Sequence, residues 1–166
     1  KTKVKRVFLS PTSAKVNDYA VEKINNADII ILSPGSLYTS IIPNLLITDI
    51  PYAISKNRKA KKYFVANIMT QHGETDGFDV TKHVTEVERH IPSDLRIFDE
   101  VIYNTGSIDD EVLKKYKKKH SKVVEANLSD EMKKKYKFTG LDLVTYMDGV
   151  VRHNSKALIE YLKTQD

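Results

Sequence analysis

The amino-acid sequence predicts an α/β fold, in the form of a three-layer domain with a mostly parallel sheet. Short runs rich in β-branched residues alternate with longer segments whose apolar residues recur every three or four positions. This alternation is typical of β-α-β units, in which helices connect parallel strands. Residues 29–32 are apolar throughout, which is the pattern of a strand covered by helices on both faces.

Each expected strand is a short run of apolar residues, most of them β-branched or aromatic. These runs lie at residues 7–9, 28–32, 63–68, 99–103, 121–126 and 141–146. The expected helices have a helical apolar period, as where Val80, Val84 and Val87 are spaced by four and three residues. They lie at residues 17–26, 49–57, 79–90, from 109 onward, and 155–163.

Composition limits the class of protein. The 166 residues are 40% hydrophobic and 30% charged, which is typical of one globular domain. The sequence has no cysteine, which excludes disulfides and cysteine-based metal sites and favours the cytoplasm. The longest apolar runs are far too short to span a bilayer, so no membrane association is expected.

The formal net charge is +5, and the basic excess lies in two runs, at residues 114–120 and 133–137. A basic excess can indicate a nucleic-acid partner, a membrane surface or a small anionic ligand. The favoured interpretation is that both runs are the solvated faces of helices. Since no RNA- or DNA-binding motif accompanies them, nucleic acid is not an expected partner.

The loop at residues 33–44 follows a predicted strand and is rich in hydroxyl groups. Gly35 permits a close ligand approach, and Ser36, Thr39 and Ser40 add hydroxyls near free backbone amides. Amides at the start of a helix favour an anion, so this loop is a candidate cradle for a phosphate-bearing ligand. The alternative is an ordinary Pro-Gly turn with hydroxyl caps.

A second polar loop, at residues 69–78, follows the next strand and belongs to the same end of a parallel sheet. Its acids Glu74 and Asp76 could bind a metal or the hydroxyls of a sugar. Alternatively, Thr75 or Asp79 caps the following helix.

Two isolated residues have ordinary explanations when taken alone. Arg152 has a planar fork suited to phosphate or carboxylate, but a surface ion pair is its default role. Tyr116 interrupts the first lysine run, where packing toward the core is favoured over stacking on a base.

Three long motifs carry a family resemblance: residues 27–46 with Ser-Pro-Gly-Ser-Leu-Tyr-Thr-Ser, residues 67–77 with Asn-Ile-Met-Thr-Gln-His-Gly-Glu-Thr-Asp-Gly, and Arg152-His153-Asn154. Together they resemble the signatures of the CofD-like gluconeogenesis-factor family (YvcK type), which is related to 2-phospho-L-lactate transferase. One departure is Ser33, where a glycine is usual. The chain, residues 1–166, is expected to be the C-terminal part of a single CofD-like domain whose N-terminal part is missing.

The resemblance implies a Rossmann-like α/β/α fold and a cytoplasmic bacterial protein. It further implies binding of UDP-sugars such as UDP-N-acetylglucosamine (UDP-GlcNAc), with links to gluconeogenic growth, cell-wall precursor supply and cell shape. Under it, Tyr116 becomes a candidate to stack on uracil and Arg152 a candidate for the diphosphate. Ser155 stands where relatives often carry a phosphorylated threonine, so it is a phosphorylation candidate.

The leading hypothesis is a regulatory protein without turnover, with a partner enzyme of amino-sugar metabolism and a possible homo-oligomeric state. The alternative is a transferase of the 2-phospho-L-lactate type, which alone would require Mg²⁺. Neither catalytic residues nor metal ligands are assigned. The expected ligand-binding residues are Gly35, Ser36, Leu37, Tyr38, Thr39, Ser40, Asn44, Asn67, Thr70, Gln71, Glu74, Thr75, Asp76, Tyr116 and Arg152.

Overall fold

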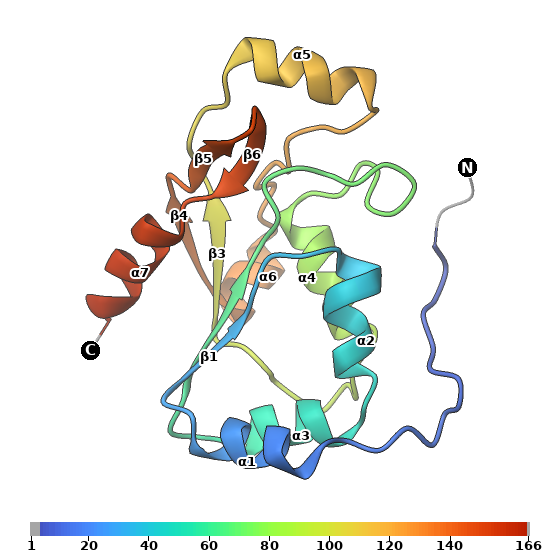
Figure 1. Cartoon of the computed structure of the whole chain (residues 1–166). Coiled ribbons are helices and arrows are strands. Elements are labelled where there is room, and N and C mark those ends of the chain that lie inside the picture. Colours follow the sequence, from blue (N-terminus) through green and yellow to red (C-terminus); the bar gives the residue numbers. More distant parts are fainter. Residues whose placement is uncertain (1–3, 166) are drawn as a thin grey trace.

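The computed structural model describes residues 4–165 and is built on a four-stranded parallel sheet (Figure 1). The strands are β1 (Ile29–Leu32), β2 (Lys61–Val65), β3 (Glu100–Asn104) and β4 (Lys137–Leu141), and they lie in that order. All three pairings are parallel. Their carboxyl ends therefore meet at one edge, where ligands bind in open α/β sheets.

One face of the sheet is covered by most of the helices. The first core cluster joins Phe64 and Val101 of the sheet to Ile42, Ile54 and Val84 of the helical layer. The helices whose residues pack in or onto this cluster are α1 (Asp18–Asn26), α2 (Ile42–Leu45), α3 (Asp49–Lys56), α4 (Val80–Glu88) and α6 (Asp130–Lys135).

The other face carries α7 (Ser155–Lys163) and an antiparallel hairpin of β5 (Val144–Met147) and β6 (Val150–His153). A second core cluster here combines strand residues with Val151 and Leu162. Helix α5 (Asp110–Lys118) packs onto it through Val112 and Tyr116 and lies beyond the carboxyl ends of the strands (Figure 1). The predicted three-layer α/β fold is thus confirmed.

Most of the expected helices are confirmed, and local chemistry explains where they begin. Asn17, Asp79, Asp109 and Asn154 each accept a backbone N–H bond as the N-cap of a helix that the sequence predicted. Within residues 4–165, no helix is long and apolar enough to cross a membrane.

Two strand predictions were wrong, one about whether a strand forms and one about how far a strand is buried. Residues 7–9 form no strand; the segment instead lies along α4, where the amide of Val7 donates to Nε2 of His90 at 3.3 Å. Strand β1 is not covered on both faces, because Ile29 and Ile31 are 41% and 39% exposed. An uninterrupted apolar run does not distinguish an edge strand from a central one.

Other expected strands differ in extent. Residues 121–126 form only one antiparallel bridge, between Val123 and Met69. The expected strand at 141–146 is divided between the end of β4 and β5. The helix expected at the second lysine run is α6, which ends at Lys135, before the run does. The sequence reasoning missed most of β4 and a short π-helix, η1 (Leu37–Ile41).

Candidate functional site

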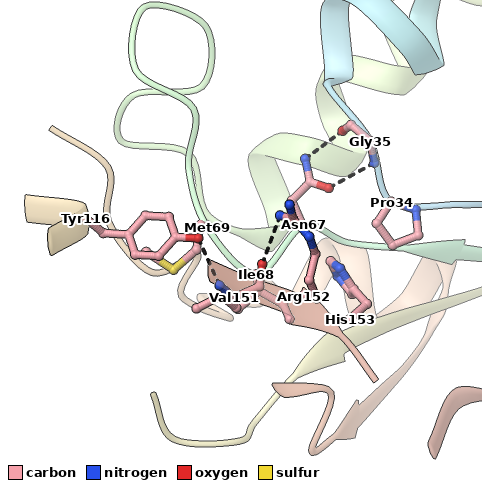
Figure 2. A pocket seen from close by; sticks show the side chains of 9 residues that line it. All are labelled: Pro34, Gly35, Asn67, Ile68, Met69, Tyr116, Val151, Arg152 and His153. Atoms are coloured by element: carbon pink, nitrogen blue, oxygen red, sulfur yellow. Dashed lines mark hydrogen bonds between the residues drawn. The ribbon is translucent and has the colours of Figure 1, made fainter. Parts of the chain in front are cut away.

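The loops that follow β1 and β2 are fastened together by a side-chain amide. Oδ1 of Asn67 accepts the N–H of Gly35 at 3.2 Å, and Nδ2 of Asn67 donates to the carbonyl of Gly35 at 2.9 Å. Both hydrogen-bonding atoms of Asn67 are therefore directed to the backbone of Gly35 (Figure 2). The structure thus assigns Asn67 the role of positioning the loop.

A second connection joins the same two loops. The hydroxyl of Ser36 donates to Oε2 of Glu74 at 2.7 Å, and Nε2 of Gln71 donates to Oε1 at 2.8 Å. The hydroxyl of Thr39 also contacts Oγ of Ser36, at 2.6 Å. Glu74 therefore accepts bonds from both loops, and the predicted residues Ser36, Thr39, Gln71 and Glu74 form one network.

The first loop leads into the π-helix η1 (Leu37–Ile41), where the amide of Ile41 donates to the carbonyl of Ser36. Single π-turns occur frequently at functional sites. The side chains of Leu37 and Tyr38 are buried in the first core cluster, and burial beside Glu86 raises the pKa of Tyr38. These two residues could contact a ligand only through their backbone, whereas Ser40 and Asn44 are exposed.

The remaining predicted residues of the second loop support its shape. Thr75 is buried, and its Oγ1 accepts the N–H of Gln71 at 2.8 Å. The amide of Thr70 donates to the carbonyl of Lys122 at 2.7 Å, and Oγ1 of Thr70 accepts the N–H of Lys122 at 2.9 Å. Asp76 accepts the N–H of Gly73 at 2.7 Å and contacts His72 at 3.1 Å. These two contacts lower the pKa of Asp76.

A metal ion has no ready ligand set in this loop. Both oxygens of Glu74 accept hydrogen bonds, and both oxygens of Asp76 are likewise engaged. Across residues 4–165, no group of three or more His, Asp and Glu residues is arranged to hold a metal.

Tyr116 and Arg152 are brought to the same edge by α5 and β6. The hydroxyl of Tyr116 accepts the N–H of Val151 at 3.1 Å, which ties α5 to the hairpin. Arg152 is the next residue of β6, and among residues 4–165 its guanidinium makes one long hydrogen bond, from Nη1 to the carbonyl of Val151 at 3.4 Å. Its guanidinium thus has most of its donors available.

These parts enclose a pocket of about 310 Å³ (Figure 2). Its walls come from both strand-end loops, from α5 and from the hairpin. The lining residues are Pro34, Gly35, Asn67, Ile68, Met69, Tyr116, Val151, Arg152 and His153.

The pocket has a positive electrostatic character. Arg152 is a cation, and no carboxylate belongs to the lining. His153 donates from Nε2 to the carbonyl of Ala66 at 3.0 Å, and burial lowers its pKa. His153 is therefore neutral near pH 7, and the charge that a ligand meets comes from Arg152.

Four of the predicted residues line this pocket: Gly35, Asn67, Tyr116 and Arg152. The other predicted residues lie in the adjoining loops. The sequence reasoning missed Pro34, Ile68, Met69 and His153 as lining residues, although each lies inside one of the three motifs. Val151 was also missed; its place depends on the hairpin, for which the Asp148-Gly149 turn was the available signal.

Ser155 is the first residue of α7 and is exposed. The preceding Asn154 caps the helix by accepting the N–H of Ala157 at 3.1 Å. A phosphate on Ser155 would lie at the positive end of the helix dipole. The position is accessible, and its modification stays a prediction.

Sequence comparison finds proteins of one family that are similar to this chain along most of its length. It is 37% identical over 159 residues to a putative gluconeogenesis factor of Clostridium acetobutylicum, covering 96% of this chain and 35% of that protein. It is 34% identical over 165 residues to the gluconeogenesis factor of Bacillus subtilis, covering 96% of this chain and 50% of that protein. The chain thus spans half or less of the length of these two relatives.

A solved structure has the same fold. The crystal structure of a UPF0052-family protein from Bacillus halodurans superposes with a TM-score of 0.88 at 35% identity, covering 96% of this chain and 50% of that one. The family model for 2-phospho-L-lactate transferase CofD matches residues 1–144. The chain therefore belongs to the CofD family.

Proposed function

We propose that this chain is part of a cytoplasmic regulatory protein that binds a nucleotide sugar, with UDP-GlcNAc as the leading candidate. The observation that carries the proposal is the pocket in which Gly35, Asn67, Tyr116 and Arg152 converge from four separate segments. The names of its relatives support a link to gluconeogenic growth. Supply of cell-wall precursors, cell shape and a partner enzyme of amino-sugar metabolism belong to the same proposal.

The lining suits the parts of such a ligand. The half-buried ring of Tyr116 lies beside Met69 and offers an apolar surface to the uracil base (Figure 2). Arg152 offers a planar fork to the diphosphate.

The pocket size favours partial enclosure. A cavity of about 310 Å³ lies at the lower end of the range for small-molecule sites. The pocket would therefore enclose the nucleotide portion, while the sugar extends over the exposed side chains of Thr39 and Ser40.

The residue types support binding over turnover. The lining includes neither a carboxylate nor a serine, threonine or lysine that could act as base or nucleophile. Its one histidine, His153, has Nε2 engaged with the carbonyl of Ala66. The two acids that the transferase alternative would use, Glu74 and Asp76, are engaged in hydrogen bonds within their loops. Although the family model carries the name of that transferase, no feature of the pocket favours the alternative.

Isothermal titration of the full-length protein with UDP-GlcNAc, and separately with GDP plus Mg²⁺, tests the proposal. We expect binding of the UDP-sugar and its loss by roughly 10- to 100-fold in Arg152→Ala, the cost of removing charge-assisted hydrogen bonds. Arg58→Ala is the matched control, because Arg58 is an exposed arginine outside the pocket. Undetectable binding of UDP-GlcNAc, or equal losses in both variants, would refute the proposal.

A further inference from the structure

Helix α5 is strongly basic on one side and packs against the core through the other. Its inner side contributes Val112 and Tyr116 to the packing against the second core cluster, yet none of its residues is fully buried. In Figure 1 it crosses the end of the molecule beyond the hairpin. Its outer side is made of exposed lysines, namely Lys114, Lys115, Lys117, Lys118 and Lys119.

Most of these lysines lack the carboxylate partners that an ordinary solvated helix face provides. Lys114 pairs with Glu111 at 2.6 Å. For Lys115, Lys117 and Lys118, no carboxylate of residues 4–165 lies within 4.0 Å.

The other basic run is different, because several of its lysines are paired. On and after α6, Lys133 lies 3.8 Å from Asp130, Lys135 pairs with Glu88, and Lys137 lies 3.1 Å from Glu100. The interpretation of both runs as plain solvated faces therefore fits α6 better than α5.

Beside the lysines of α5 lies an exposed apolar patch. Tyr146 and Met147, at the tip of the hairpin, are 46% and 61% exposed. The hydroxyl of Tyr146 accepts the N–H of Asp109 at 2.9 Å, which fixes the hairpin tip to the start of α5. A Cβ added to Gly149, in the turn of the hairpin, would lie 3.8 Å from Nζ of Lys115. The basic side of α5 thus adjoins the apolar hairpin tip, through Lys115 and through the start of the helix.

We propose that this surface, the outer lysines of α5 with Tyr146 and Met147, is a docking site for an acidic protein segment that carries an apolar side chain. Opposite charge gives attraction and orientation, and Tyr and Met are enriched at protein interfaces. The inference is independent of the nucleotide-sugar site.

Two other anionic partners fit less well. The first is a nucleic acid, whose phosphates are bound most specifically by the planar fork of arginine. The patch contains no arginine for bidentate phosphate contacts. A membrane-surface helix would insert an apolar face, whereas the apolar residues of α5 already pack against the core.

Fluorescence anisotropy of the full-length protein with a labelled oligoglutamate peptide that contains a central leucine tests the proposal. We expect binding that weakens roughly tenfold in the double variant Lys117→Glu/Lys118→Glu, since two attractive charges become repulsive. Met147→Ser should weaken this peptide several-fold and leave a leucine-free oligoglutamate unchanged.

The double variant Lys133→Glu/Lys134→Glu is the control. It makes the same change of net charge at exposed lysines of α6 and should leave peptide binding within about twofold of the unmodified protein. Absence of peptide binding, or equal weakening in the two double variants, would overturn the proposal. Stronger α5-dependent binding to duplex DNA or to phosphatidylserine vesicles than to the peptide would overturn it as well.

Discussion

Replacing Asn67 with alanine should loosen the pocket even though the new side chain fits the available space. The carboxamide of Asn67 makes two hydrogen bonds to the backbone of Gly35, at 3.2 and 2.9 Å. Without them the loop after β1 keeps its bond to Glu74 but loses its direct tie to the end of β2. The pocket wall at Gly35 would then be free to move.

The two hydrogen bonds between Asn67 and Gly35 set the expected loss of stability. Each hydrogen bond contributes a net 0.5–1.5 kcal/mol, so the loss of both should lower the free energy of unfolding by about 1–3 kcal/mol. Near the middle of that range, Tm should fall by about 4–8 °C for a chain of this size. The affinity for UDP-GlcNAc should fall roughly tenfold, because only the fraction of molecules with an ordered loop can bind.

Urea denaturation and isothermal titration measure the two effects. Asn26→Ala is the control, since the side chain of Asn26 is exposed and bonds only within α1, to the carbonyl of Glu22. Unchanged stability and unchanged affinity in Asn67→Ala would refute the assigned positioning role. A tenfold loss of affinity without any loss of stability would instead indicate that Asn67 contacts the ligand itself.

Two further predictions concern Tyr116 and His83. Tyr116→Phe keeps the ring and removes the hydrogen bond to Val151, so it should lower the free energy of unfolding by about 1 kcal/mol. In titration it should weaken the binding of UDP-GlcNAc only a few-fold. Equal losses of affinity in Tyr116→Phe and Tyr116→Ala would contradict stacking. His83 is fully buried, and burial lowers its pKa below that of an exposed histidine. At mildly acidic pH the unfolded chain therefore binds more protons at this residue than the folded chain does. The free energy of unfolding should then decline as pH falls below about 6.5. Urea midpoints measured between neutral and mildly acidic pH should show a smaller decline in His83→Leu, and an identical pH dependence would contradict this assignment.

The sequence alone was sufficient to predict the layers and the edge that carries the site. Parallel β-α-β logic put the loops at 33–44 and 69–78 at one edge, and the bonds among Ser36, Glu74 and Gln71 confirm that they meet. These features depend on local periodicity and on the rule that parallel strands end together.

The parts that escaped prediction depend on contacts between distant residues. Strand β4 contains Lys137, Thr139 and Gly140 and so lacks an apolar run. It forms because it pairs with β3 and because Thr139 bonds to the buried Glu100. The inward packing of Tyr116 was the favoured interpretation from spacing, but its bond to Val151 requires the hairpin. That hairpin was missed although Asp148-Gly149, both with positive φ, is the local signal of a two-residue hairpin turn.

The three methionines of the chain allow the most direct test of the proposed nucleotide-sugar site. Met69 lines the pocket, whereas Met132 on α6 and Met147 at the hairpin tip lie outside its lining. In NMR spectra of protein labelled at the methionine methyl groups, saturating UDP-GlcNAc should shift the Met69 signal. The signals of Met132 and Met147 should move by less than one line width. A Met69 signal unchanged at saturating UDP-GlcNAc would contradict the central claim.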